Sequence, residues 1–248
     1  MITTWLGTIG ALGLLTAQAF VALVKPPWDL REWIRQAEQI GVRSLGVASI
    51  TTVFTGMVLA LQTAYSLPSL GVKYYIGTVV SKSLTRELGP VLVALIVGGR
   101  IGAGMTAELG TMKVTEQIDA LRAMAADPVK KLVAPKLAAT LVMLPCLTIL
   151  GDVLGILGGL IIAVFQLKVS AGLYLNDVLS ALTIEDVASG VGKSFFFAYF
   201  IAIIGCYHGL GARGGADGVG RATTNTVVLA SIMVLVSDFF LTKLFYLL

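Results

Sequence analysis

The sequence is poor in charge. Only 13% of its 248 residues are Asp, Glu, Lys or Arg, which is about half of the roughly 25% found in soluble domains. Long apolar runs stand in their place, among them Leu132 to Leu167 and Val227 to Leu241. Runs of this length exclude an ordinary soluble domain and predict an all-α membrane protein.

Cysteine is also scarce, and the net charge is small. Cys146 and Cys206 both lie inside apolar runs, so we expect small buried side chains and neither a disulfide nor a metal site. The net charge of +4 comes from lysines and arginines near the ends of apolar runs. This placement is typical of membrane boundaries and does not indicate a nucleic-acid surface.

A complete nucleotide-binding loop is missing. Gly192-Lys193-Ser194 resembles the end of such a loop, but Val187 stands where the motif needs glycine. The motif should also follow a strand, whereas these residues open an apolar helix. We therefore expect no ATPase and no cofactor on this chain.

The N-terminal region, residues 1–44, is predicted to form interfacial helices. Trp5 to Val24 lacks a basic region before it and a cleavage site after it, so we interpret it as a retained segment. It is either a span or an interfacial helix. Pro26-Pro27 ends it, and Asp29 then caps an amphipathic helix that lies on the membrane surface.

Residues 45–248 are predicted to form a five-span membrane domain. The spans are expected at roughly 45–65, 76–104, 132–165, 187–210 and 226–245. Basic residues concentrate on one side, which we assign to the cytoplasm. The N-terminus is then cytoplasmic, the C-terminus is outside, and residues 105–131 form a cytoplasmic segment.

Within the spans, glycines recur at four-residue spacing, as at Gly98 and Gly102, Gly151, Gly155 and Gly159, and Gly205 and Gly209. Such spacing lets helices approach closely in lipid. We favour ordinary helix packing over a sliding interface as the explanation.

Several ionisable residues fall inside the predicted spans, where each costs several kcal/mol unless it meets a partner or water. They are Arg86, Glu87, Arg100, Asp152, Lys193, His208 and Asp238. Most of them fall in the outer half of their spans. They form either an outward-facing cavity or structural ion pairs, such as Glu87 with Lys193.

The segment between spans two and three contains a short helix, predicted over 115–124 and stopped by Asp127-Pro128. It either lies on the membrane or docks on a cytoplasmic partner. In a transporter without its own ATPase, an external motor would act here.

At these residues the chain resembles the MlaE permeases of lipid-transporting ABC systems associated with MCE proteins. The resemblance covers nearly the whole chain. It is carried by 86–90 (RELGP), Gly99-Arg100, 106–110 (TAELG), 115–117 (TEQ), Asp127-Pro128, 218–224 (GVGRATT) and the late VSDFFLT.

The resemblance implies a homodimer of five-span permeases in the bacterial inner membrane. It implies cytoplasmic ATPase subunits that bind ATP and Mg, a STAS-domain subunit and a periplasmic ring of MCE-domain protein. The cargo would be phospholipid moving between the inner and outer membranes, a process tied to outer-membrane lipid asymmetry.

The resemblance also implies two sets of functional residues. The substrate-binding set is Leu59, Gln62, Leu70, Arg86, Glu87, Val91 and Lys193. The ATPase-coupling set is Glu108, Thr115, Glu116, Asp119, Leu121 and Arg122.

A different class of function stays open beside this one. An ion- or proton-coupled secondary transporter would use Glu87, Asp152 and Asp238 as a relay. It would need no ATPase, and it often shows an inverted repeat, which we do not find in the sequence. A purely structural membrane anchor would not need charges in several spans.

Overall fold

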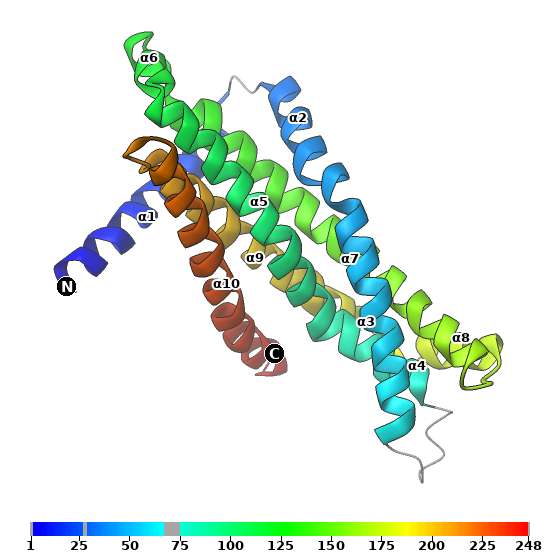
Figure 1. Cartoon of the computed structure of the whole chain (residues 1–248). Coiled ribbons are helices and arrows are strands. Elements are labelled where there is room, and N and C mark those ends of the chain that lie inside the picture. The colour runs from blue at the N-terminus through cyan, green and yellow to red at the C-terminus, as the bar shows by residue number, and fades with distance from the viewer. Residues whose placement is uncertain (1, 27–28, 67–74, 248) are drawn as a thin grey trace. The chain divides into compact units, whose positions relative to one another are not determined.

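The computed structural model describes residues 2–26, 29–66 and 75–247, and within these ranges the regular secondary structure is helical throughout. The helices, shown in Figure 1, are α1 (Ile2–Val24), α2 (Leu30–Ile40), η1 (Val42–Ser44), α3 (Leu45–Ser66), α4 (Ile76–Ser83), η3 (Leu84–Leu88), α5 (Gly89–Val114), α6 (Gln117–Ala123), η4 (Val129–Val133), α7 (Ala134–Phe165), α8 (Ala171–Ala181), α9 (Ile184–Leu210) and α10 (Gly215–Leu247). Of these, η3 and η4 are π-helical turns.

Among the described residues, five helical stretches are long and apolar enough to cross a membrane. They are Leu30–Ser66, Ile76–Val114, Val129–Phe165, Ile184–Leu210 and Gly215–Phe245. This confirms the prediction of an all-α protein with five membrane-spanning helices. The apolar helix at Gly10–Val24 is shorter, and its relation to the membrane stays a prediction.

The chain divides into two compact units. The first unit contains Met1–Arg43, Gly98–Met143 and Phe196–Ser237, and the second contains Ser44–Val97, Leu144–Phe195 and Asp238–Leu248. Helices α5, α7, α9 and α10 each contribute residues to both units. The sequence-based boundary at residue 44 stays a prediction.

Helix α2 begins where the sequence predicts. The Asp29 carboxylate accepts a hydrogen bond from the backbone N–H of Glu32 at 3.3 Å, which is an N-cap. Its buried residues are Gln36 and Ile40, whereas Leu30 and Ile34 are exposed. Exposed apolar residues on one face suit a helix that lies against lipid.

Helix α8 was not predicted, because residues 166–186, between the predicted spans three and four, are a polar stretch in the sequence. Ser170 caps it by accepting from the N–H of Leu173, and Tyr174 and Val178 are buried one turn apart. It lies beside α4 (Figure 1), where the Asp177 carboxylate accepts from the N–H of Thr78 at 2.8 Å. Helices α4 and α8 are both short, and each is thus stabilised by contact with the other.

The spaced glycines lie at helix contacts. In the second unit a side chain at Gly56 of α3 would overlap the backbone of Gly155 in α7. In the first unit an added Cβ at Gly205 would lie 3.2 Å from the carbonyl oxygen of Gly102. These positions support the packing interpretation, since a Cβ would clash with backbone at Gly56 and would be crowded at Gly205.

One cysteine prediction is wrong. Cys206 is buried as expected, but Cys146 is exposed, and both are free thiols. An apolar run does not place every residue inside the protein, because one face of a membrane helix contacts lipid.

We expect Gly56→Leu to destabilise the protein by about 1–3 kcal/mol or more, because α3 must move away from α7. Thermal unfolding of the purified permease in detergent measures this change. Gly46→Leu is the matched control, since an added Cβ there meets nothing within 4 Å. Equal melting of the two variants would contradict the close-packing role of Gly56.

Candidate functional site

A buried lysine forms the centre of the candidate site in the second unit. The Lys193 side chain of α9 is fully buried, and its Nζ lies 2.6 Å from Glu87 Oε2 and 3.2 Å from Asp238 Oδ1. Nζ also donates to Thr242 Oγ1 at 2.7 Å. The predicted pair of Glu87 and Lys193 is therefore present, within a larger cluster.

One ammonium group in this cluster faces two carboxylates. With all groups ionised, Lys193, Glu87 and Asp238 together carry one surplus negative charge. Asp238 Oδ1 is buried, and its contact with Lys193 Nζ at 3.2 Å is an ion pair that lacks hydrogen-bond geometry. In a weakly polar environment such a surplus favours a bound cation or a proton.

A backbone carbonyl beside Glu87 also belongs to the Lys193 cluster, and the sequence explains why it is available. Pro90 has no N–H, so the Arg86 carbonyl lacks the donor that an α-helix would supply. Lys193 Nζ donates to this carbonyl at 3.0 Å. The chain forms the π-helical turn η3 just before Gly89, and Gly190 lets α9 approach it, since an added Cβ there would overlap the Thr85 carbonyl oxygen.

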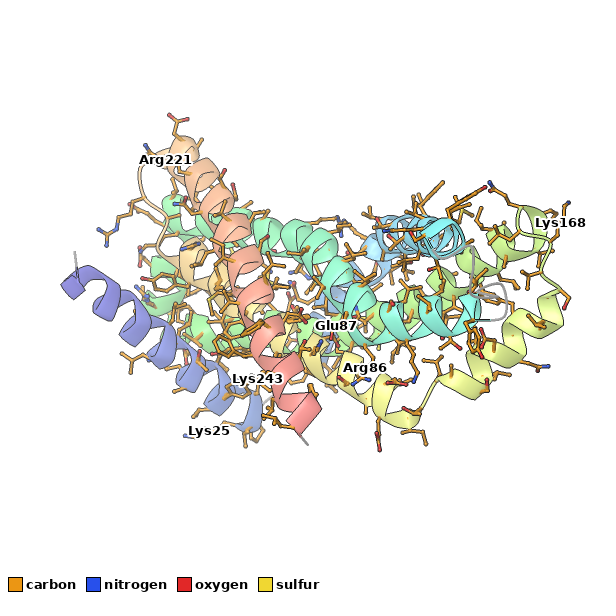
Figure 2. All side chains as sticks on the ribbon, turned by 90° about the horizontal axis from the view of Figure 1, so that it is seen from below. Lys25, Arg86, Glu87, Lys168, Arg221 and Lys243 are labelled. Carbon is orange, nitrogen blue, oxygen red and sulfur yellow. The ribbon has the colours of Figure 1, made fainter. Side chains whose placement is uncertain are left out.

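Arg86 has a different partner from Glu87, although both belong to η3 (Figure 2). Its Nη1 lies 3.3 Å from Asp186 Oδ1. Asp186 and Thr183 bond reciprocally at the start of α9: Asp186 Oδ2 accepts from the N–H of Thr183 at 3.0 Å, and Thr183 Oγ1 accepts from the N–H of Asp186. This is a capping box with Asp in the fourth position. Asp186 was not predicted as a site residue, although the pattern Thr-x-x-Asp indicates a helix start.

An apolar groove lies next to this turn. It has a volume of about 500 Å³ and is lined by Ile50, Thr51, Phe54, Thr55, Val58, Leu59, Gln62 and Leu88. Leu88 follows Glu87 directly in η3, so the groove and the charged cluster share one turn. The groove therefore offers a surface for an apolar chain beside the charged groups.

The predicted substrate-binding residues are thus distributed over three places. Leu59 and Gln62 line the groove, Glu87 and Lys193 form the ion pair, and Arg86 contacts Asp186. Val91 is half-buried on α5. Leu70 lies outside the described residues. Their role in binding stays a prediction.

A second buried carboxyl group lies in the same unit. Asp152 of α7 is 7% exposed, and within the described ranges its Oδ1 has no hydrogen-bond partner. An added Cβ at Gly89 would overlap this oxygen, so the glycine makes room for the carboxyl group. The residues described contain no cluster of His, Cys, Asp and Glu that could hold a metal ion.

The coupling segment differs in detail from the prediction. Helix α5 continues without a break to Val114, and α6 begins at Gln117, after Glu116 with a left-handed φ of 60°. Thr115 is therefore outside α6, and its Oγ1 donates to the Thr111 carbonyl. Helix α6 ends at Ala123, before Ala125 with a left-handed φ of 56°. The Asp127 carboxylate accepts from Val129 N–H at the start of the next helix.

Helix α6 is attached to the end of α5 by an ion pair, and it buries one apolar side chain. Asp119 lies 2.8 Å from Lys113 Nζ and 3.2 Å from Arg122 Nη1, and Ile118 is fully buried. Leu121 is half-buried, whereas Arg122 and Met124 are exposed. The helix therefore keeps an exposed surface while it is fixed to α5.

Glu108, another predicted coupling residue, faces α7. Its Oε2 lies 2.6 Å from Lys136 Nζ, and the Lys136 side chain is almost fully buried. The burial of Lys136 was not predicted, since the residues LVAPK give no sign of a partner 28 positions earlier.

Removing the central ammonium group should destabilise the protein more than removing one carboxylate. We expect Lys193→Met to cost about 3–5 kcal/mol, because it leaves Glu87 and Asp238 without their shared counter-charge. Glu87→Gln should cost less, since Lys193 keeps Asp238. Thermal unfolding in detergent compares them, and a larger loss for Glu87→Gln would refute the central role of Lys193.

The attachment of α6 should depend on the charge of Asp119. The hydrogen bond from Lys113 and nearby positive charges hold the pKa of Asp119 below its ordinary value of 3.8. The stabilisation is therefore complete above that value and is lost as pH falls through the lower folded-state pKa. At neutral pH, Asp119→Asn should reduce hydrogen-exchange protection of the amides of residues 117–123, whereas Asp217→Asn, an exposed control, should not. Unchanged protection in Asp119→Asn would show that Ile118 alone holds α6.

Comparison with known proteins places these features in a family. The family model described as Permease MlaE matches residues 33–244. The chain is 44% identical to a probable ABC transporter permease protein of Rickettsia typhi, over 96% of this chain and 92% of that protein. It is 36% identical to the intermembrane phospholipid transport system permease protein MlaE of Haemophilus influenzae, over 95% and 92%. It is 34% identical to the chloroplastic protein TRIGALACTOSYLDIACYLGLYCEROL 1 of Arabidopsis thaliana, over 94% and 67%. The chain belongs to the MlaE permease family.

Proposed function

We propose that this chain is the permease subunit of an ABC transporter that moves phospholipid between the inner and outer membranes of a bacterial envelope. The observation that carries the proposal is the pairing of a charged cluster with an apolar groove in the second unit. The name of the Haemophilus influenzae relative, which specifies intermembrane phospholipid transport, supports the same substrate class.

The two parts of the site match the two parts of a phospholipid. The groove along α3 exposes Ile50, Phe54 and Val58, which suit acyl chains. The cluster of Lys193, Glu87 and Asp238 has one surplus carboxylate, which suits the ammonium group of a headgroup. Because η3 contributes to both, a lipid in the groove brings its headgroup to Glu87.

Arg86 extends the polar end of the site. Its guanidinium lies beside Asp186 and is partly exposed, so it is placed to interact with a headgroup phosphate. Glu87, Arg86 and Lys193 would together meet or gate the headgroup. Leu59, Gln62, Val91 and Leu70 complete the proposed binding set.

Energy would come from a separate ATPase subunit that binds ATP and Mg in the cytoplasm. Arg122 of α6 and Met124 just after it are exposed. This exposed surface supports α6 as the place where the ATPase subunit docks. Force applied there would pass through the ion pair of Asp119 and Lys113 to α5. ATP binding on the partner would collapse the lipid cavity and expel the lipid.

The wider assembly is part of the same proposal. The permease would act as a homodimer with its lipid cavity at the dimer interface, facing the periplasm. A STAS-domain subunit and a ring of MCE-domain protein would complete the complex in the inner membrane. The N-terminus would be cytoplasmic and the C-terminus periplasmic.

A proton-coupled secondary transporter is the second candidate, and Asp152 is the observation that favours it. A buried carboxyl group without a hydrogen-bond partner is a feature of proton relays. The first proposal needs ATP and a partner subunit, whereas this one needs only a proton gradient. The energy source therefore distinguishes the ABC transporter from the secondary transporter.

A reconstituted lipid-transfer assay tests the polar site. The complex is placed in proteoliposomes, and transfer of a fluorescent phospholipid is followed with ATP. We expect the double variant Glu87→Ala, Lys193→Ala to reduce transfer roughly tenfold or more, which corresponds to about 1.4 kcal/mol of lost interaction. Glu185→Ala, an exposed carboxylate close to Asp186, is the control and should transfer normally.

Transfer that is undiminished in the double variant would remove Glu87 and Lys193 from the headgroup site. Transfer driven by a proton gradient without ATP would instead favour the secondary transporter. Co-purification of an ATPase subunit with the wild-type chain supports the ABC transporter.

A further inference from the structure

Helix α8 has an exposed apolar face that the transport site described above does not use. Leu179 is 75% exposed, and Leu175, one turn earlier, is exposed as well. The four-residue spacing places both leucines on one face of the helix. The same helix buries Tyr174 and Val178. Helix α8 is therefore apolar on two faces, and among the described residues only one of these faces is covered.

The covered face fixes α8 against α4 and α7. Tyr174 and Val178 belong to an apolar core that also contains Ile76 and Val80 of α4. The Tyr174 hydroxyl donates to the carbonyl of Ile156 in α7 at 3.0 Å. Helix α8 therefore cannot rotate to bury its second face without breaking this core.

Both ends of α8 are tied to helices that are long and apolar enough to cross the membrane. Residues 166–170 join it to α7, and this link folds back on α7, since the N–H of Val169 donates to the Ala163 carbonyl at 3.0 Å. Residues 182–183 alone separate α8 from α9. A link of two residues reaches about 10 Å at most. Helix α8 thus lies where α7 and α9 meet the membrane surface.

The side chains at these ends are typical of a lipid boundary. Phe165, the last residue of α7, is exposed, and Ile184, the first residue of α9, is 89% exposed. Tyr75, which precedes α4, is also exposed. Tyrosine is enriched where membrane helices reach the interface. Exposed apolar and aromatic side chains therefore occur on the helices that adjoin α8 as well as on α8 itself.

The charge of α8 favours lipid over a soluble protein as the partner of the exposed face. Asp177 is its one charged residue, and the Asp177 carboxylate accepts hydrogen bonds from the N–H and the hydroxyl of Thr78 in α4. The leucine face carries only small polar side chains beside the leucines, such as Asn176 and Ser180. A protein interface usually has a polar and charged rim, whereas insertion among lipid headgroups requires apolar side chains with no unpaired charge beside them.

We propose that α8 is an interfacial helix that inserts Leu175 and Leu179 among the lipids of the leaflet at the C-terminal end of α7. Bilayer lipid covers this face. Because α8 packs on α4 and α4 leads directly into η3, the inserted helix holds the turn that carries Glu87 at a set depth in the membrane. The proposal concerns bulk lipid and does not depend on which molecule is transported.

Photocrosslinking in a bilayer tests what covers the leucine face. Leu179→p-benzoylphenylalanine is introduced into the intact transporter, which is reconstituted into phosphatidylcholine nanodiscs with tritiated acyl chains. After irradiation, covalent label on the permease is counted, and adducts with other chains are read from a denaturing gel. We expect roughly ten times more label than with the same reporter at Asp217, an exposed residue at the start of α10, because acyl chains surround an inserted side chain and not one in water.

Two results would overturn the proposal. Label at Leu179 no higher than at Asp217 would place the face in water, and an adduct with a protein chain in place of lipid would show that a protein partner covers α8. If the Leu179 variant does not yield the complex, the same reporter at Leu175 decides. A negative result in the phospholipid-transfer assay bears on the cargo and leaves this contact standing.

Discussion

The structure depends on ammonium groups that are buried among apolar helices and neutralised by carboxylates. Among the described residues, Lys193 contacts Glu87 in the second unit, and Lys136 contacts Glu108 in the first. Without these partners the burial of either lysine would cost several kcal/mol. Both glutamates come from one continuous stretch, η3 and α5, so span two supplies the counter-charge for both units. This explains why a chain with few charges places them inside its helices.

The two lysine sites differ in what remains after pairing. In the second unit Lys193 faces two carboxylates, Glu87 and Asp238, whereas Lys136 in the first unit contacts the Glu108 carboxylate and the Gln36 amide oxygen. A cationic group is the complement of the second carboxylate, and the ammonium group of a phospholipid headgroup is such a group. The surplus carboxylate is therefore a more informative sign of ligand chemistry than the ion pairs, which by themselves explain only stability.

Backbone irregularity determines how the charged cluster is built. Pro90 leaves the Arg86 carbonyl without its helical donor, and Lys193 donates to it in place of the missing N–H. Gly190 and Gly89 make room for the neighbouring carbonyl and for Asp152. A side chain at either glycine would separate these groups. The site is thus a property of the helix contacts as much as of the ionisable residues.

The sequence by itself determined the local features of the fold. Asp29 as a cap, the helix over most of 115–124 and the five apolar spans follow from side-chain preferences and from the length needed to cross a membrane. The pair of Glu87 and Lys193 was open as one of two alternatives, because spacing alone does not say which helix faces which.

Tertiary structure decided which residues are buried and which side chains and helices contact one another. The burial of Lys136, the role of Asp186 and the packing of α8 on α4 all involve partners distant in the chain or a short element with weak local signals. The exposure of Cys146 has the same origin, since an apolar run fits both a protein interior and a lipid surface. Hydropathy determines that a segment enters the membrane, and helix packing determines what each of its residues meets there.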